Sequence, residues 1–165
     1  MQALDHDELS IHIGAPPEAV YAIVADVTRT PQYSPEVVEC TWLGGATGPA
    51  PGARFKARNR VGRMSWSNKP IVTVAEPGRE FAFARTEPLC GTVQWRYRFD
   101  PEDGGTRVTE SYLVVRPITR PGWIVVSGFG KDRNRAKTMH EGMEQSLQRL
   151  RAMAEAEQAG WSRNR

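Results

Sequence analysis

Hydrophobic and polar residues alternate with a period of two along much of the first 115 residues, which is the pattern of half-buried strands. The alternation is clearest in segment 54–60, where Phe55, Ala57 and Asn59 separate four basic residues. Further strands are predicted over segments 8–13, 37–43, 64–75, 80–86, 92–99 and 106–115. Asp103-Gly104-Gly105, between the last two of these segments, is a strong hairpin signal.

Apolar residues recur at helical spacing in two places. Pro16, Pro17 and Glu18 provide a proline and an acidic residue for a first turn, and the apolar residues of segment 19–27 then follow one helix face. Each proline in segment 30–35 disfavours helical conformation in the residue before it, so a second short helical turn or a bend is predicted there. Charged residues flank one apolar stripe in segment 132–159, which predicts a helix about 40 Å long.

This order of one strand, two short helices, six strands and a long helix predicts an α+β fold. The predicted sheet has one face of Arg and Gln and one apolar face, and the apolar face must be covered. Segment 132–159 is long enough to cover it, so we expect a curved seven-stranded antiparallel sheet wrapped around this C-terminal helix, with space between them. The length of 165 residues predicts a single domain over residues 1–165.

Composition narrows the class of protein. Hydrophobic residues make up 39% of the chain and charged residues 25%, which excludes a disordered chain, a collagen-like chain and a disulfide scaffold. No segment has the roughly 20 apolar residues of a membrane span, and the polar segment 1–9 is not that of a signal peptide. Cys40 and Cys90 lack CxxC spacing, so free thiols and a cytoplasmic location are expected.

The residue types that usually carry catalysis or metal binding form no recognisable constellation. The three histidines have no carboxylate or cysteine at ligand spacing, so neither a metal nor another cofactor is expected. Ser127 lacks the first glycine of a nucleophile elbow, and the Gly-rich segment 44–52 lacks the Gly-Lys-Ser/Thr of a phosphate-binding loop. The basic residues of segment 54–60 are expected on a solvated sheet face, so no nucleic-acid partner is predicted.

The last predicted strand carries an unusual polar residue. The period of two puts Val108, Glu110 and Tyr112 on one face, so an interior Val108 implies an interior carboxylate. Burial raises the pKa of a carboxyl group, which is how a general acid or base near neutrality is made. Glu110, Tyr112 and Arg85 are therefore the candidate catalytic residues. The alternatives are contact with a bound ligand, an ion pair of Glu110 with Arg85 that only sets strand register, or a slipped register with Glu110 facing water.

The same alternation predicts a mostly aromatic pocket with a few polar points. Gly142, in the middle of the long helix, costs roughly 1 kcal/mol relative to Ala, and its missing side chain leaves room for a ligand or for a closely crossing strand. The neighbouring methionines tolerate ligands of varied shape. The candidate ligand-binding residues are Phe55, Asn59, Trp66, Asn68, Phe81, Phe83, Trp95, Tyr97, Met139, Gly142 and Met143. Plain core packing is the alternative role for the aromatic residues.

Several motifs of the chain resemble those of one superfamily. They are Ile13-Gly-Ala-Pro-Pro-Glu-Ala-Val-Tyr21, Trp42-Leu-Gly-Gly45, Pro51-Gly-Ala-Arg-Phe55, Glu76-Pro-Gly-Arg79, Gly105-Thr-Arg-Val-Thr-Glu110 and His140-Glu-Gly-Met143. Together with the order of elements, they make the chain resemble the SRPBCC or START-like helix-grip superfamily over roughly residues 8–156, and its bacterial polyketide cyclase/dehydrase-like members in particular. The resemblance implies a helix-grip fold. It says little about chemistry, because the superfamily uses one cavity for transport, sensing and catalysis.

Three functions stay open on this evidence. The first is binding of a hydrophobic small molecule, such as a lipid, a polyketide or an isoprenoid, in a cavity between sheet and helix. The second is a polyketide cyclase or dehydratase in which Glu110, Tyr112 or Arg85 moves protons. The third is a stress-related or protein-interaction module whose contact surface is the apolar segment 123–126. A monomer or homodimer without stable membrane insertion is expected.

Overall fold

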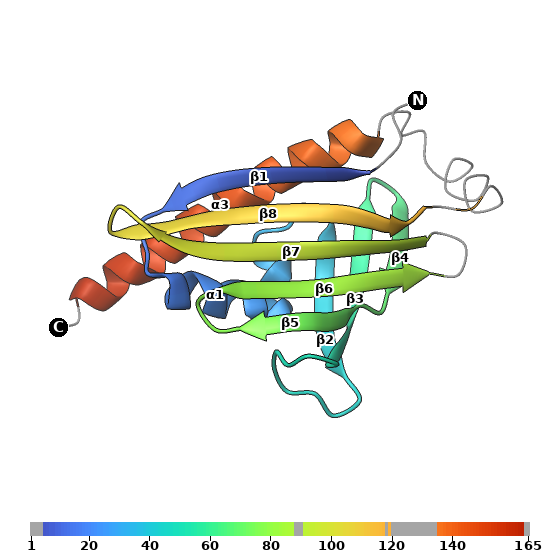
Figure 1. Cartoon of the computed structure of the whole chain (residues 1–165), viewed down its shortest axis with the longest axis horizontal. Helices are drawn as coiled ribbons and strands as arrows, with labels where there is room; N and C mark the ends of the chain where they lie inside the picture. The colour runs from blue at the N-terminus through green and yellow to red at the C-terminus, as the bar shows by residue number, and fades with distance from the viewer. Residues whose placement is uncertain (1–4, 88–90, 118, 120–134, 164–165) are drawn as a thin grey trace.

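One antiparallel sheet curls along a long helix in the computed structural model of the chain (Figure 1). The structure describes residues 5–87, 91–117, 119 and 135–163. The strands are β1 (His6–Ile13), β2 (Val37–Leu43), β3 (Arg54–Val61), β4 (Met64–Asn68), β5 (Ile71–Glu76), β6 (Glu80–Glu87), β7 (Gly91–Glu102) and β8 (Gly105–Arg116). The helices are α1 (Pro17–Ala25), the 3-10 helix η1 (Val27–Gln32) and α3 (Arg135–Arg163).

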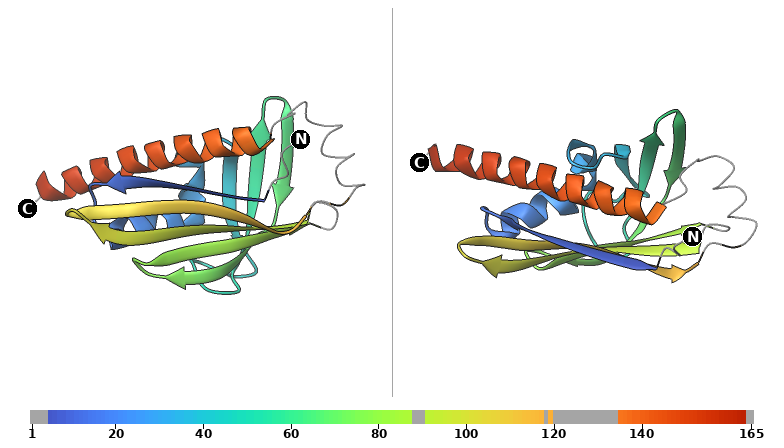
Figure 2. Two further views of the ribbon diagram at one scale, coloured as in Figure 1. Left: turned by 45° about the horizontal axis from the view of Figure 1, so that its top comes forward. Right: turned by 90° about the horizontal axis from the view of Figure 1, so that it is seen from above.

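The path of the sheet confirms the predicted architecture. Seven strands lie side by side in the order β1-β8-β7-β6-β5-β3-β2, and each neighbouring pair is antiparallel. Two short helices follow the first strand, and the long helix comes last, as the sequence predicts. All three helices lie on the same side of the sheet, which curls around them (Figure 2). The chain therefore has the α+β helix-grip fold.

The strand predicted over segment 64–75, with a bulge at Pro70, is two strands in the structure. β4 pairs with β3 and lies off the seven-strand path, whereas β5 belongs to that path. Pro70 has no backbone N–H to donate to a strand ladder, and its carbonyl accepts a hydrogen bond from Phe55 N at 3.2 Å. The proline therefore ends β4 and transfers the pairing of β3 to β5, which meets β3 at Arg54 and Ile71.

The hairpin between β7 and β8 forms where the sequence predicts it. Asp103 and Gly104 have φ values of 47° and 72°, the left-handed conformation that a tight turn between two strands requires. Both strands have 12 residues, and their register places Tyr97 directly opposite Glu110. The turn thus sets the register that pairs Tyr97 with Glu110.

The hydrophobic core lies between the sheet and the helices. Val20, Ile23 and Val24 of α1 are buried in it, at the spacing of one helix face. The ring of Tyr21 meets that of Phe99 on β7 edge-on, with the ring centroids 5.7 Å apart. The short helices therefore pack against one end of the curled sheet, and the cavity lies beside them.

Helix α3 has 29 residues, about 43 Å of helix, and ends at Arg163, beyond the predicted end at residue 159. Its second half is anchored to the rest of the fold. Gly14 N donates a hydrogen bond to Glu155 Oε1 at 2.9 Å, and Arg29 of η1 forms an ion pair with Glu157. These contacts hold the C-terminal half of the helix close to β1 and η1.

Some predicted features lie outside the described residues. They are the apolar segment 123–126, the predicted helix start at Asp132, and Cys90. Cys40 is buried, and its thiol is free.

Candidate functional site

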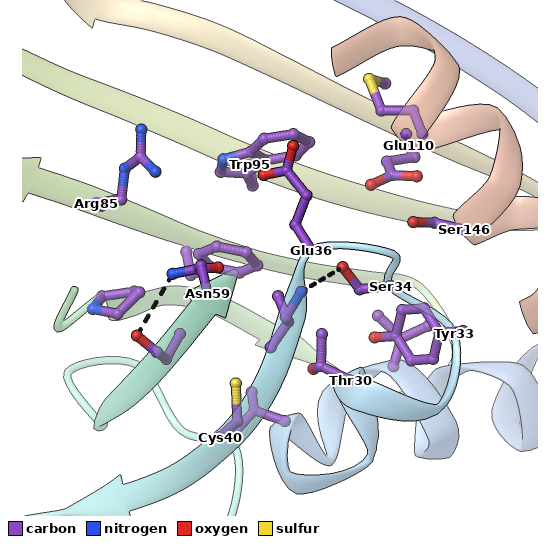
Figure 3. Close-up of a pocket in the computed structure, with 18 of the residues that line it drawn as sticks. Thr30, Tyr33, Ser34, Glu36, Cys40, Asn59, Arg85, Trp95, Glu110 and Ser146 are labelled. Atoms are coloured by element: carbon purple, nitrogen blue, oxygen red, sulfur yellow. Dashed lines mark hydrogen bonds between the residues drawn. The ribbon is translucent and has the colours of Figure 1, made fainter. Parts of the chain in front are cut away.

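A cavity of about 140 Å³ lies between the first half of α3 and the inner face of the sheet (Figure 3). Its walls also include η1 and the segment from Tyr33 to Val37 that leads into β2. Most of the lining side chains are aromatic or aliphatic, among them Phe81, Phe83 and Trp95. The curved sheet and the helix therefore leave a pocket between them.

Twelve of the predicted site residues line this cavity. They are Phe55, Asn59, Asn68, Phe81, Phe83, Arg85, Trp95, Tyr97, Glu110, Met139, Gly142 and Met143. Strand alternation places the nine strand residues on one face, because every second residue of a strand points to the same side, and the other three come from one face of α3. On β3, for example, Phe55, Ala57 and Asn59 are buried while the basic residues between them are exposed. That the lining residues bind a ligand remains a prediction.

Trp66 and Tyr112 are predicted site residues that the structure places elsewhere. Trp66 lies opposite Asn59 on β4, in the hairpin that leaves the main path of the sheet, and it is half-buried outside the cavity lining. Tyr112 is buried, and its ring packs against Trp95 with the centroids 5.3 Å apart. It also packs in one cluster with Met143 of α3, beside the residues that line the cavity, and its role in proton transfer stays a prediction.

A different tyrosine contacts the buried carboxyl group. Tyr97 Oη donates a hydrogen bond of 2.6 Å to Glu110 Oε1, and the side chains are 7% and 3% exposed. Burial raises the pKa of Glu110 to about 8, although the hydrogen bond from Tyr97 acts in the opposite direction. Burial and the nearby carboxyl group also raise the pKa of Tyr97 well above its usual value. At neutral pH Glu110 is thus mainly an uncharged carboxylic acid.

The ion pair between Glu110 and Arg85, which the sequence leaves open, is not the contact that holds the carboxyl group. Arg85 Nε lies 3.8 Å from Glu87 Oε1, and no cation among the described residues contributes to the pKa of Glu110. Arg85 belongs to the cavity lining, in a part of the cavity separated from Glu110 in Figure 3. Glu110 is therefore a polar point inside the cavity and not half of a register-setting salt bridge.

The first half of α3 is tied to the cavity rim by charged groups. Arg135 donates two hydrogen bonds to the Glu36 carboxylate, at 2.9 and 3.0 Å, and both side chains are about three-quarters buried. His140 Nδ1 lies 2.7 Å from Asp7 Oδ2 on β1. These contacts join the helix to both the segment before β2 and the edge strand, so they hold the helix over the cavity.

Several polar residues of the lining are absent from the sequence prediction. They are Thr30, Tyr33, Ser34, Glu36, Cys40, Arg135 and Ser146. Tyr33 and Ser34 lie between two prolines, where the sequence predicts only a turn or a bend. Ser146 lies in the otherwise apolar stripe of α3. A polar residue on that stripe was the one feature of the sequence that could have indicated a cavity-lining residue there. Burial raises the pKa of the Cys40 thiol to about 11, so it is protonated at neutral pH.

Three other kinds of feature were considered outside the cavity: a metal site, a membrane-spanning helix and the basic residues of β3. Within the described residues, no group of three His, Cys, Asp or Glu side chains is arranged to hold a metal ion. The same part of the chain contains no helix long and apolar enough to cross a membrane. The basic residues exposed on the outer face of β3, as predicted, are Arg54, Lys56, Arg58 and Arg60.

The fold and the cavity define a helix-grip protein with a mostly apolar internal space. Residues 7–155 match the family described as polyketide cyclase / dehydrase and lipid transport. The match covers nearly the whole chain, so the protein belongs to this family.

Solved structures are similar to the chain over most of its length. The Polyketide_cyc-like protein Cgl2372 from Corynebacterium glutamicum is 32% identical, with 92% of each chain covered and a TM-score of 0.59. A START superfamily protein from Mycobacterium smegmatis is 16% identical over 93% of this chain and 99% of its own, with a TM-score of 0.69.

The di-domain ARO/CYC StfQ from the steffimycin biosynthetic pathway is 13% identical, with a TM-score of 0.74. The alignment covers 96% of this chain and 52% of StfQ, so the chain spans about half of that protein. No curated protein matches the chain significantly. At these identities, StfQ and the mycobacterial protein are evidence for the fold alone.

Proposed function

We propose that the protein binds a small, mostly apolar molecule in the cavity beneath α3. The observation that carries this proposal is the cavity lining, in which aromatic and aliphatic side chains surround one buried carboxyl group, Glu110. Ligand sites typically combine an apolar lining with a few polar groups that orient the ligand. Membership of a family whose description includes lipid transport supports the same function.

The size of the cavity restricts the ligand. An engineered apolar cavity of about 150 Å³ takes up benzene, so a cavity of about 140 Å³ accepts one ring or a short branched chain. Burying apolar ligand surface contributes roughly 25 cal/mol per Å² before the entropic costs of binding. Among lipids, polyketides and isoprenoids, the geometry therefore supports a ring-sized molecule, or a ring-sized part of a larger one, held inside.

Filling the cavity from the helix is expected to block binding. A Cβ at Gly142 would have Pro35 Cγ, at 3.8 Å, as its nearest neighbour outside the helix, so a side chain there has room to extend. In Gly142→Leu the new side chain should occupy ligand space and weaken binding roughly tenfold or more. The helix itself should not suffer, because Leu is a better helix former than Gly. Native mass spectrometry of the purified protein should show a co-purified ligand that this variant lacks.

Gly160→Leu is the matched control. Gly160 lies in the same helix, outside the cavity lining, and a Cβ there would meet no atom within 4 Å. This variant should keep the ligand. Equal ligand occupancy in both variants would contradict binding beneath α3, whatever the effect on stability.

A second candidate function is an enzyme of the cyclase/dehydrase type. The observation that favours it is a carboxyl group with a pKa of about 8, hydrogen-bonded to Tyr97 at the wall of the cavity. A group with a pKa near the working pH is an efficient proton donor and acceptor. A confined cavity also holds a reactive chain in a productive geometry, which lowers the entropic part of the barrier. Glu110 is the proposed acid or base, and Tyr97 is its positioning residue.

Glu110→Gln is expected to distinguish the two functions. For an enzyme acting on a short poly-β-keto substrate, the variant should lower kcat at least about a hundredfold, the usual contribution of a general acid or base. For a binding protein, the affinity for apolar probes should change little. The measurement is product formation by chromatography, with Gly160→Leu as the control for handling and folding. Unchanged turnover in Glu110→Gln would exclude Glu110 as the acid or base.

The cellular setting stays a prediction. The absence of CxxC spacing still favours a cytoplasmic location with reduced thiols, and a monomer or homodimer is expected. The interaction-module hypothesis depends on segment 123–126, outside the described residues, so the structure adds no support to it.

A further inference from the structure

One oxygen in the cavity wall has no hydrogen-bond partner among the residues that the structure describes. Glu110 Oε1 accepts the hydrogen bond from Tyr97, whereas Oε2 is fully buried and has no hydrogen-bond partner in the part of the chain that the structure describes. Buried polar atoms are nearly always hydrogen-bonded, because an unpaired one loses its water without compensation. The partner of such an atom in a cavity wall is either an ordered water molecule or a polar group of a bound ligand.

The position of the proton follows from the partner of the other oxygen. Tyr97 is protonated, since its pKa lies well above the usual value, so its hydroxyl group donates and Oε1 accepts. An uncharged carboxyl group carries one proton, and the oxygen that already accepts a hydrogen bond leaves that proton on the other. Oε2 is therefore an O–H donor at neutral pH. A carboxylic acid kept neutral by an apolar site is a known way of donating a hydrogen bond to a carbonyl oxygen.

The other polar groups of the cavity do not change this assignment. Tyr33 from the segment after η1, Cys40 from β2 and Ser146 from α3 are neutral groups that face the same cavity. The charged groups of the lining are Glu36, Arg85 and Arg135. Arg135 is bound to Glu36, and Arg85 is paired with Glu87. In Figure 3, Glu110 and Ser146 lie apart from Arg85 and Asn59, and the Glu36 carboxylate, which is paired with Arg135, lies between Arg85 and Glu110.

We propose that Oε2 of Glu110 is a hydrogen-bond donor for the ligand and that it selects molecules with a neutral carbonyl oxygen over molecules with a carboxylate. This inference rests on the proposed binding function and names the chemical class of its ligand. A ketone or aldehyde oxygen satisfies the unpaired donor. A carboxylate at the same place is disfavoured, because it would have to give up its hydration in an apolar surrounding beside a second carboxyl group.

Three one-ring probes of nearly equal shape test the inference. Ethylbenzene has no polar atom, acetophenone adds one carbonyl oxygen, and benzoate carries a carboxylate. Titrations of the isotope-labelled protein followed by NMR measure weak affinities for all three. At pH 6.5, acetophenone should bind roughly tenfold more tightly than ethylbenzene, the effect of one hydrogen bond to a buried donor. Benzoate should bind more weakly than either.

Variants of Glu110 and a pH series test whether this side chain causes the preference for acetophenone. The preference for acetophenone over ethylbenzene should decline as the pH passes about 8, because Glu110 then loses its proton. Glu110→Gln should keep the preference at every pH, since the amide keeps an N–H donor beside the ligand and an oxygen beside Tyr97. Glu110→Leu should lose it. If Glu110→Leu does not fold, the pH series on the unmodified protein and on Glu110→Gln still tests whether Glu110 donates the hydrogen bond to the ligand.

Each other result has a separate meaning. Equal affinities for acetophenone and ethylbenzene at pH 6.5 would overturn this inference and leave the proposed apolar binding intact. Tighter binding of benzoate than of acetophenone would overturn it in favour of recognition by the arginines. Failure of all three probes to bind would overturn the proposed function for ring-sized ligands together with the inference.

Discussion

The free energy of unfolding of the unmodified protein is expected to fall by about 5 kcal/mol as the pH rises from 4.5 to about 8, and Glu110→Gln is expected to abolish this fall. The carboxyl group has an ordinary pKa of 4.5, and burial raises the pKa in the folded protein to about 8. One pKa unit corresponds to about 1.4 kcal/mol of difference between the two states. The expected effect therefore comes from a single side chain.

The direction follows from proton binding. Between pH 4.5 and about 8, the folded protein keeps the proton of Glu110 and the unfolded chain has lost it. Raising the pH therefore favours the unfolded state, and the free energy of unfolding should fall by about 1.4 kcal/mol per pH unit in this window. Below the window the contribution is constant. Above it the loss is complete, because Glu110 is then ionised in both states.

Other shifted groups act outside this window. A backbone hydrogen bond from Gly14 is the main cause that lowers the pKa of Glu155, so the contribution of Glu155 is lost as the pH falls below 4.5. Burial raises the pKa of Cys40 from 9.0 to about 11, so that thiol destabilises the fold only above pH 9. The difference between the two proteins in the window thus reports on Glu110.

Urea unfolding of both proteins at half-unit pH steps measures the effect. Tyr97→Phe is a useful companion variant. Removing the hydroxyl group that lowers the pKa of Glu110 should extend the falling part of the stability curve to higher pH. Parallel curves for the unmodified protein and Glu110→Gln would show that Glu110 is not protonated in the folded state, and would remove the basis of the donor assignment.

Phe81→Ala should lower the free energy of unfolding by about 3–5 kcal/mol, the usual cost of removing a buried aromatic side chain. Phe81 is 1% exposed, and it packs against Phe83 with the ring centroids 6.0 Å apart. It also lines the cavity, so its removal leaves a larger space that the surrounding strands cannot close. Urea unfolding at pH 6.5 measures the loss, and the variant should accept two-ring probes that the unmodified protein excludes.

Leu113→Ala is the control for this change. Leu113 is on β8 and 48% exposed, so its truncation should cost well under about 1 kcal/mol, as is usual for surface positions. A loss below about 1 kcal/mol in Phe81→Ala, similar to that in the control, would mean that the aromatic wall of the cavity is not packed as described.

Much of the site followed from strand alternation. A period of two on one strand was enough to put Glu110 on the same side as Val108, and both are buried. The aromatic lining from Phe81, Phe83 and Trp95 was predictable for the same reason. Such predictions succeed because alternation is a local property of the extended backbone, and it holds whichever strands become neighbours.

The errors concern relations between distant segments. Tyr112 shares a face with Glu110, but the side chain that reaches the carboxyl group is Tyr97, directly opposite on β7. Trp66 has the right alternation, but Pro70 directs β4 away from the main sheet. The two sides of the Glu36–Arg135 contact are 99 residues apart, and no local pattern joins them.

The order of hydrophobic and polar residues was thus sufficient for the order of strands and helices, except the division of segment 64–75, and for the inner face with its buried carboxyl group. Folding in three dimensions determined which tyrosine holds Glu110, which of its oxygens stays unpaired, and that a space of about 140 Å³ remains beside it. Local patterns depend on backbone geometry, which repeats every few residues. A hydrogen bond or a cavity depends on the final separation of side chains from several elements, which the packing of the whole domain sets.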